Sequence, residues 1–304
     1  MEDKKLVVID GSSLIYRAFY ALPRLTTSSG LPTGATLGFL NMVLKLLDDY
    51  RPFNVVVAFD HPQKTFRHEL QESYKAQRKP MPDELKPQIG IVKELLELMG
   101  FVILEMPGWE GDDLMGSVKE KVKSDFQVLL VTSDLDMLQL LDERTVLLQP
   151  HRGVTSLKKI DLEEFQKEWG ISPAQWVDVL ALSGDPSDNI FGVPGIGEKT
   201  AVKLILQFGS WEGILNHLSL LPPKLREAIE SNRDKVEENR KLIVLEKDLP
   251  LDLEIQAWGW SKVDKNKLFQ KLESLEFRKI KERLVKNNRV NSGSLFSHWD
   301  EEKE

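Results

Sequence analysis

Short apolar runs alternate with helical patterns along the first half of the chain. Each run is rich in β-branched residues and lacks polar alternation, so each predicts a strand buried on both faces. Between the runs, apolar residues recur every three or four positions, as on the buried face of a helix. The predicted strands are 5–9, 54–59, 101–104, 127–131 and 144–148. This alternation predicts an α/β fold with a mostly parallel central sheet flanked by helices.

Helical signals dominate from about residue 161 onward. Ser172, Pro173 and Gln175 have the spacing of a capping box at a helix start. Further helices are expected at 199–207, 211–218, 223–231, 235–246, 265–275 and 278–286. We therefore expect an α/β part at 1–182 and a helical region at 183–290. The stretch 291–304, with Asn, Ser and Gly before an acidic end, is expected to be a poorly ordered tail.

Composition excludes several classes of protein. The chain has no cysteine, so it has neither disulfides nor thiolate ligands or nucleophiles, and any metal must be bound by oxygen or imidazole. No apolar run approaches the roughly 18 residues of a membrane span, and we expect a cytoplasmic protein without membrane contact. The formal net charge of −7 argues against general binding of nucleic acid, unless the charges are unevenly distributed.

Carboxylates follow almost every predicted strand. Because the carboxyl ends of parallel strands meet at one edge of a sheet, nine acids are expected to converge there. They are Asp10, Asp60, Glu110, Asp112, Asp113, Asp134, Asp136, Asp185 and Asp188. So many anions in a small volume repel unless protons or cations neutralise them. Oxygen ligands suit Mg²⁺ or Mn²⁺, and a split cluster can hold two ions about 4 Å apart for phosphodiester hydrolysis.

Each acid also has a structural interpretation. Asp112 or Asp113 could cap the helix that follows, and Asp134 with Asp136 could form a turn. Asp185 and Asp188 could belong to an Asx-type loop. For any single acid the cap is favoured, but a helix needs one cap and not two or three. The conjunction of all nine favours a metal site.

A long charged segment separates the second strand from the next helix. About 25 residues lie there, far more than the usual connection, which indicates a functional or mobile insertion at about 61–84. Its central part, 64–79, carries a net charge of +3, with Phe66 and Tyr74 interleaved. If it folds into a helix, Lys75 and Arg78 lie on one face, where both could contact a reacting phosphate, while Tyr74 could stack on a base.

A Gly-Val-Pro-Gly-Ile-Gly turn leads into the helix that starts near Lys199. Backbone N–H groups of such a turn, at the positive end of a helix, can bind phosphate. A tight corner without a ligand is equally consistent with the pattern, although Lys199 and Lys203 favour the nucleic-acid backbone. The basic block 278–289 is at least partly a solvated helix face. The five histidines are scattered without metal spacing, and no nucleophilic triad is evident.

Taken in order, these motifs resemble the 5′ nuclease family. The stretches are Val8-Ile9-Asp10-Gly11-Ser12, Ala58-Phe59-Asp60, Thr65-Phe66-Arg67, Tyr74-Lys75-x-x-Arg78, Glu110-x-Asp112-Asp113, Thr132-Ser133-Asp134-x-Asp136, Gly184-Asp185-x-x-Asp188-Asn189 and the glycine-rich turn from Gly192 to Gly197. The 5′→3′ exonuclease domain of bacterial DNA polymerase I is the nearest match. Phage 5′ nucleases and flap endonucleases are more distant.

The resemblance implies a PIN-like, resolvase-like core with two Mg²⁺ or Mn²⁺ ions. Asp10, Asp60, Glu110 and Asp112 would form the first metal group, with Asp134 between the groups. Toward the second group would lie Asp113, Asp136, Asp185 and Asp188. The insertion would be a helical arch that passes a 5′ single strand, and the glycine turn would be a helix-hairpin-helix-like module that holds duplex and can bind K⁺.

The resemblance also implies roles for individual residues, according to their positions in these motifs. Lys75, Arg78 and Asp134 are the expected catalytic residues. The expected DNA-binding residues are Arg67, Tyr74, Lys75, Arg78, Gly195, Gly197, Lys199, Thr200 and Lys203. Phe191 stands where the family commonly has proline.

The implied activity is a structure-specific 5′→3′ exonuclease and 5′-flap endonuclease, a monomer that acts on DNA with 5′ flaps, nicks or 5′ ends, or on RNA primer/DNA hybrids. Its implied roles are Okazaki-fragment maturation and repair. Two rivals remain: a DNA-junction binding module without chemistry, which the nine acids disfavour because a binder would gain affinity by losing them, and a small acidic-site ribonuclease, which the duplex-binding corner and basic arch disfavour.

Overall fold

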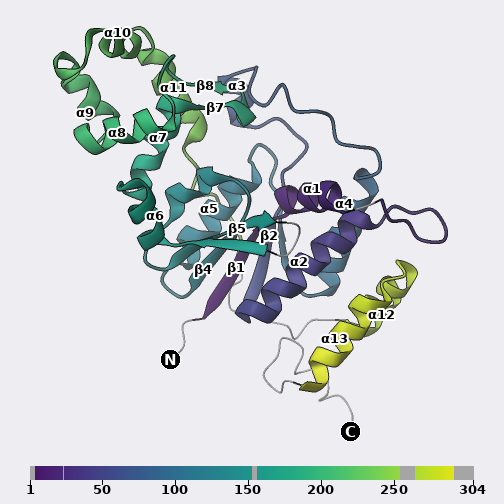
Figure 1. Cartoon of the computed structure of the whole chain (residues 1–304). Helices are drawn as coiled ribbons and strands as arrows, with labels where there is room; N and C mark the ends of the chain where they lie inside the picture. The colour runs from purple at the N-terminus through teal and green to yellow at the C-terminus, as the bar shows by residue number, and fades with distance from the viewer. Residues whose placement is uncertain (1–3, 23, 153–155, 254–263, 291–304) are drawn as a thin grey trace.

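The computed structural model describes residues 4–22, 24–152, 156–253 and 264–290, so the expected tail at 291–304 lies outside the described residues. A six-stranded sheet in the order β3-β2-β1-β4-β5-β6 forms its centre. The strands are β1 (Lys5–Asp10), β2 (Asn54–Ala58), β3 (Val102–Leu104), β4 (Gln127–Val131), β5 (Thr145–Arg152) and β6 (Ser156–Ile160). All pairs are parallel except β5 with β6. The expected α/β fold is confirmed (Figure 1).

Strand β6 is the one part of the sheet that the sequence pattern did not predict. Its five residues include two lysines and only one fully buried side chain, Ile160. An antiparallel edge strand has one face in water, so it lacks the continuous apolar run by which the inner strands are recognised. For this reason β6 carries no signal of a buried strand in its sequence.

The sheet separates two apolar cores. Successive strand residues point to opposite faces, so Val8 and Val56 enter one core while Val7 and Val55 enter the other. On the first face lies α5 (Gly111–Val122). On the second lie α1 (Gly11–Ala21), α2 (Gly34–Tyr50) and α4 (Lys86–Leu98).

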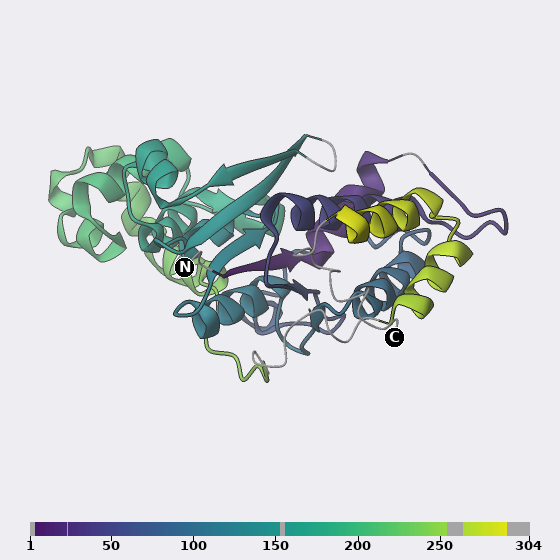
Figure 2. The same cartoon turned by 90° about the horizontal axis from the view of Figure 1, so that it is seen from below.

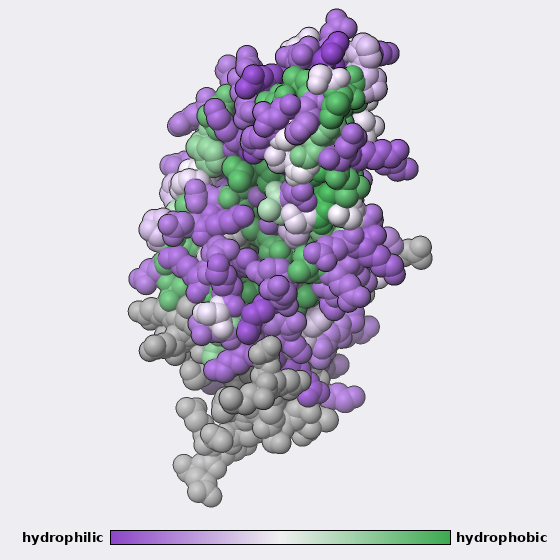
Figure 3. All heavy atoms as spheres, turned by 90° about the vertical axis from the view of Figure 1, so that its left-hand side faces the viewer, coloured by the Kyte–Doolittle hydropathy of each residue, from purple (hydrophilic) through white to green (hydrophobic). Residues whose placement is uncertain are grey.

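Helices from the second half extend the first core into a helical region at one end of the molecule (Figure 1). They are α6 (Leu162–Trp169), α7 (Trp176–Ser183), α8 (Glu198–Phe208), α9 (Trp211–Asn216), α10 (Pro223–Ser231) and α11 (Arg233–Ile243). The capping box of Ser172 and Gln175 is present, on a 3-10 turn just before α7. The outer face of this region is covered mainly by hydrophilic side chains (Figure 3). No helix in the described ranges is long and apolar enough to cross a membrane.

The last two helices return to the other side of the sheet. Helices α12 (Lys265–Ser274) and α13 (Arg278–Val290) pack against α2 and α4, far from α8–α11 (Figure 2). Leu268 and Leu284 are almost fully buried in the second core. Ion pairs from Lys271 to Glu94 (2.5 Å) and from Arg283 to Asp48 (2.5 Å) border this contact.

The charged insertion contains little helix. A single five-residue helix, α3 (Phe66–Leu70), is followed by consecutive turns from residue 72 to 77. The expected helix that would place Lys75 and Arg78 on one face is therefore wrong. Lys75 adopts the left-handed backbone region, with φ of 54°, which an ordinary residue avoids in a helix.

Candidate active site

Carboxylates gather where the sequence pattern placed them, at the carboxyl ends of the parallel strands. Asp10 ends β1, and Asp60 and Asp134 follow β2 and β4 by a few residues. Because β2, β1 and β4 are neighbours in the sheet, these three acids lie side by side on one edge. Asp136 follows Asp134 in the 3-10 helix η1 (Leu135–Leu140), and Glu110 and Asp112 belong to the start of α5.

Asp10 combines a capping role with a strongly perturbed acidity. Its carboxylate accepts hydrogen bonds from the Ser13 backbone N–H (2.8 Å) and from the Thr132 hydroxyl (2.8 Å). Burial, with the negative charge of Asp60 adding to it, nevertheless raises the pKa of Asp10 to about 7. The two hydrogen bonds thus lower the pKa of Asp10 by less than burial and the charge of Asp60 raise it.

No capping role explains Asp112. Glu110 is the N-cap of α5 and forms a capping box with Asp113, so the helix start is satisfied without Asp112. The Oδ1 atom of Asp112 is buried and accepts no hydrogen bond. Burial, then the charges of Asp10 and Asp134, raise its pKa well above the ordinary value. An unpartnered carboxylate oxygen beside other carboxylates is the arrangement that a bound cation would satisfy.

Asp134 and Asp136 share this electrostatic strain. Asp134 caps η1 through the Asp136 backbone N–H (2.9 Å), which confirms the turn interpretation for this pair. Burial raises the pKa of both carboxyls, and the charge of Asp134 adds to the shift at Asp136. We call Asp10, Asp112, Asp134 and Asp136 the open acidic group, because their repulsion is not compensated by paired cations.

Asp113 differs from its neighbour Asp112 in having partners for its carboxylate. Its side chain is fully buried and accepts two hydrogen bonds from the Arg67 guanidinium, at 2.6 and 2.8 Å. The backbone N–H of Glu246 also donates to it (3.0 Å). With its oxygens occupied in this way, Asp113 has a structural role in this structure, and its expected assignment as a metal ligand stays a prediction.

Arg67 is likewise structural. Only 1% of it is exposed, and besides Asp113 it donates to the carbonyl oxygens of Leu242 (2.6 Å) and Val244 (3.2 Å). Burial opposes its charge, but the hydrogen bonds and charge of Asp113 outweigh this and raise its pKa. The guanidinium faces the protein interior in this structure and joins the insertion to the last turn of α11 and to Val244, and the expected DNA-binding role of Arg67 stays a prediction.

The insertion places two cations against Glu110 and Asp188. Lys75 Nζ lies 3.0 Å from Glu110 and 3.4 Å from Asp188, and Arg78 lies 2.5 Å from Asp188. Burial would raise the pKa of Asp188, but the charges of Lys75 and Arg78 outweigh it and lower this pKa. We call Glu110, Asp113 and Asp188 the paired acidic group, because cations of the chain itself neutralise them.

Tyr74 is also part of this contact. Its side chain is 3% exposed, and its hydroxyl lies 3.0 Å from both Glu110 Oε2 and Asp188 Oδ2. Burial and the charges of those two carboxylates raise the pKa of Tyr74 far above its usual range, so the phenol stays a hydrogen-bond donor. A ring buried in this way does not present its face to a base in this structure, and the stacking role expected from the sequence stays a prediction.

Asp60 and Asp185 lie at the edge of the site. Asp60 accepts from the Gly111 backbone N–H (2.8 Å), and its own N–H donates to Ser12 (3.0 Å). Asp185 caps the 3-10 turn η3 (Pro186–Asp188) through the Ser187 N–H (2.7 Å). In the described part of the chain, no three acidic or histidine side chains already surround one point as a metal cage. The donor set, all carboxylate oxygen, fits Mg²⁺ or Mn²⁺ once ions draw it together.

The glycine-rich corner lies between a two-stranded hairpin, β7 (Gly184–Asp185) with β8 (Ile190–Phe191), and helix α8. Gly195 has a φ of 85°, which requires glycine, and Gly197 is the N-cap of α8 without a side-chain cap. A Cβ at either glycine would meet no atom within 4 Å. Lys199 and Lys203 are exposed on α8, and Thr200 is partly exposed. The corner thus has backbone with open space beside it and two exposed lysines.

Three residues were missed by sequence reasoning because their role is to support others. Thr132 donates to Asp10, Ser12 accepts from the Asp60 N–H, and Asn189 donates its side-chain amide to Ser73 (2.7 Å). All three lie inside the sequence motifs that contain the acids, so their closeness to those acids in the sequence was the available signal.

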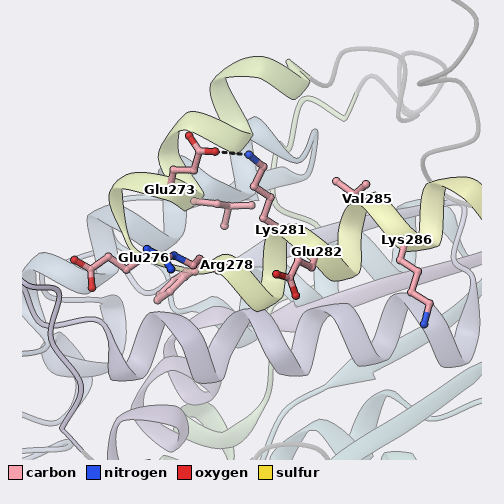
Figure 4. A pocket seen from close by; sticks show the side chains of 9 residues that line it. Glu273, Glu276, Arg278, Lys281, Glu282, Val285 and Lys286 are labelled. Atoms are coloured by element: carbon pink, nitrogen blue, oxygen red, sulfur yellow. Dashed lines mark hydrogen bonds and ion pairs between the residues drawn. The ribbon is translucent and has the colours of Figure 1, made fainter.

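A separate hollow of about 690 Å³ lies against α12 and α13 (Figure 4). Apolar Leu272, Phe277 and Val285 line it together with charged residues, two of which, Glu273 and Lys281, form an ion pair. None of the acids at the sheet edge lines this hollow. It is therefore not part of the candidate active site.

Two family models match this chain. The model of the 5′-3′ exonuclease N-terminal resolvase-like domain matches residues 5–170, and that of the 5′-3′ exonuclease C-terminal SAM fold matches 171–266. The chain is 39% identical over 278 residues to the 5′-3′ exonuclease of Aquifex aeolicus, covering 91% of this chain and 94% of that protein. It is 39% identical over 287 residues to DNA polymerase I of Mycobacterium tuberculosis, covering 92% of this chain and 31% of that polymerase.

Solved structures share the fold. The flap endonuclease of bacteriophage T5, solved with DNA and metal ions, has a TM-score of 0.64 at 22% identity and covers 92% of this chain and 100% of that one. T5 5′-exonuclease with bound zinc has a TM-score of 0.65 at 23% identity, with 80% and 90% covered. The catalytic core of Rad2 with DNA substrate has a TM-score of 0.61 at 19% identity, with 93% and 91% covered.

The chain spans about a third of the length of the DNA polymerase I relatives it matches, but nearly the whole length of the Aquifex exonuclease. Both family models lie in order and together cover residues 5–266. The chain therefore belongs to the 5′-3′ exonuclease family.

Proposed function

We propose that this protein is a divalent-metal-dependent, structure-specific 5′ nuclease that hydrolyses DNA at 5′ ends, nicks and 5′ flaps. The observation that carries the proposal is the buried, unpartnered Oδ1 of Asp112 among carboxyls whose pKa values burial and mutual repulsion raise. Family membership supplies the reaction class. The biological setting would be removal of RNA primers or flaps during DNA replication and repair.

The open acidic group, with Asp60, would hold the ions. When bound, Mg²⁺ or Mn²⁺ would activate water and stabilise the charge that develops on the phosphate and on the leaving 3′ oxygen. Asp10 and Asp112 would supply oxygen ligands toward one ion position, and Asp136 and Asp185 toward a second, with Asp134 between them. Thr132 and Ser13 hold the Asp10 carboxylate in place for this role.

Lys75 and Arg78 would position the reacting phosphate. In the present structure both cations rest against Glu110 and Asp188, at the border of the open acidic group. A phosphodiester entering here would replace a carboxylate as their partner, since phosphate also binds such cations. Charge stabilisation of the reacting phosphate affects turnover more than affinity.

Duplex DNA would bind at the glycine-rich corner. The N–H groups at the start of α8, with Lys199 and Lys203, would contact one strand's phosphates, and backbone carbonyls of the turn would offer a K⁺ site. We propose residues 1–182 as the nuclease core, with the insertion at 61–84, and 183–290 as the duplex-binding region. The protein would act as a monomer.

One assay separates this proposal from its rivals. Purified protein is incubated with a 5′-flap duplex, fully paired DNA and single-stranded RNA, each with Mg²⁺ or with a chelator. A structure-specific 5′ nuclease cleaves the flap substrate only with Mg²⁺. Binding of the flap without cleavage in either condition would identify a junction-binding module, and preferential cleavage of the RNA would identify a ribonuclease.

A further inference from the structure

The insertion and the hairpin before the glycine-rich corner are held together by a set of direct hydrogen bonds. Segments 71–78 and 185–189 are more than 100 residues apart in the chain, yet they share backbone and side-chain contacts along their length. The contacts are Asn189 Nδ2 to Ser73 O (2.7 Å), Gln71 Nε2 to Asn189 O (3.2 Å), Lys75 N to Asp188 O (3.0 Å), and Gln77 Nε2 to Pro186 O (2.9 Å) and Ser187 O (3.0 Å).

Asn189 is the central residue of this contact. Its side-chain amide donates to the insertion and its carbonyl accepts from the insertion, so it contacts both Ser73 and Gln71. It adopts the left-handed region, with φ of 60° and ψ of 31°, which Asn tolerates better than most residues. The backbone conformation aims the amide at the carbonyl of Ser73, two residues before Lys75.

Lys75 needs such support. Its own backbone is left-handed, and its N–H donates to Asp188, the residue just before Asn189. An unusual φ persists where the surrounding contacts hold it. These contacts are what brings Lys75 Nζ to 3.0 Å from Glu110 at the acidic edge.

On its other side, Asn189 is joined tightly to the corner. Strand β8 begins at the next residue and pairs with β7. The buried Asn239 side chain of α11 donates to Phe191 O (3.0 Å) and to Ala181 O (2.9 Å), which fixes β8 to α7 and α11. A Cβ at Gly192 would lie 2.2 Å from the Ser183 carbonyl carbon, so the chain passes there without free space. The turn from Gly192 to Gly197 follows directly.

We propose that Asn189 is a positioning residue that couples the corner to the insertion: its side-chain amide holds Lys75 at the reacting phosphate when the corner holds duplex. This inference rests on the proposed function, since it assigns a role within the same site. The competing explanation is that position 189 needs only a residue that tolerates the left-handed backbone. The two explanations differ in what they require of the side chain.

Three variants separate them. Asn189→Gly keeps the backbone freedom and removes the amide, Asn189→Asp keeps the size and removes the donor, and Asn189→Ala removes the amide and strains the backbone. We expect all three to lower single-turnover cleavage of a 5′-flap duplex by about tenfold, the scale of one lost hydrogen bond. The dissociation constant for the same duplex should change less than about threefold. The matched control is Asn232→Ala, which removes an amide hydrogen bond of similar length, to Ala228 O (2.8 Å), away from the site.

A second measurement is independent of cleavage. Because the chain has no cysteine, Ala76→Cys carries a single nitroxide label on the exposed part of the insertion. We expect the label to become more mobile in Asn189→Gly and Asn189→Asp than in the Asn232→Ala control. Unchanged mobility, or a wild-type cleavage rate in the glycine variant, would overturn the positioning role. If the unmodified protein cleaves no substrate, the proposed function fails, while the label still reports whether Asn189 holds the insertion.

Discussion

The open and the paired acidic groups lie on one edge of the sheet but are neutralised in different ways. In the paired group, Arg67, Lys75 and Arg78 supply the positive charge, and the pKa of Asp188 is lowered as a result. In the open group, burial and mutual repulsion raise the pKa values of Asp10 and Asp112. The same residue type is stabilised by the fold in one group and destabilised in the other. The contrast indicates that an external cation would act at the open acidic group, whose charges the cations of the chain do not neutralise.

The largest effect is expected from breaking the open group. Asp112→Asn removes the unpartnered carboxylate, and we expect single-turnover cleavage of a 5′-flap duplex to fall by at least about a thousandfold. The same change relieves repulsion, so the melting temperature in a chelator should rise while the added stabilisation by Mg²⁺ shrinks. Asp125→Asn, at an exposed position outside the site, serves as the control. Near wild-type turnover in Asp112→Asn at saturating Mg²⁺ would remove this residue from the metal site.

Removing a cation from the paired group should have a smaller effect on catalysis. Lys75→Ala is expected to lower the single-turnover rate on the same flap by about a hundredfold, since it removes one charge partner of the reacting phosphate. Duplex affinity should change little. The rate and the dissociation constant are measured on one substrate. A pure affinity defect with normal chemistry would assign Lys75 to binding and take the insertion out of the reaction.

Cations outside both groups should alter binding alone. Lys199→Ala combined with Lys203→Ala is expected to weaken duplex binding, and the slope of log K against log salt should fall by about 2, one for each lost phosphate contact. Metal dependence of cleavage should stay as in the unmodified protein. Titrations with single-stranded oligonucleotides provide the contrast, and an equal loss on single strands and duplex would contradict a duplex-specific role.

The smallest expected effect is the pH dependence of the stabilisation by Mg²⁺, which tests the comparison between the two groups. The pKa of Asp10 is about 7 in the folded protein against an ordinary value of 3.8, so the folded state binds this proton more tightly than the unfolded state. Stability from this group is present at low pH and is lost as pH rises from about 4 to about 7. We therefore expect Mg²⁺ to raise the melting temperature by a few degrees more at pH 7.5 than at pH 5. Equal increments at both values would show that the open group is already neutralised.

Sequence reasoning recovered the sheet and its acidic edge because both depend on short-range signals. Buried strands are continuous apolar runs, and an acid after each run must lie at the shared edge. The fates of Asp112 and Asp113 could not be separated in this way. Successive residues of a helix point about 100° apart, so one faces the acidic edge and the other faces Arg67. Which of the two residues faces Arg67 depends on a contact between positions 46 residues apart in the chain.

The insertion shows the other limit of sequence patterns. Its charges suggested a helix with exposed cations, whereas Lys75 is held in a left-handed conformation by Asp188 and the insertion by Asn189. Contacts between segments more than 100 residues apart leave no periodic trace in either segment. Helical signals in the second half were recovered well, as for α10, because that helix carries its own start signal, a proline in its first turn, and an apolar face.

The return of α12 and α13 to the far face of the sheet has a consequence for synthesis. The second core contains Val7 from β1 and Leu284 from α13. These two residues are separated by almost the full length of the chain, so they are synthesised far apart in time. A ribosome that has released only the first half of the protein leaves α2 and α4 with an uncovered apolar surface. Contacts at such long separation form late and slow the final folding step. Truncation before residue 268 should therefore produce a chain that aggregates, even though every acid of the sheet edge is present.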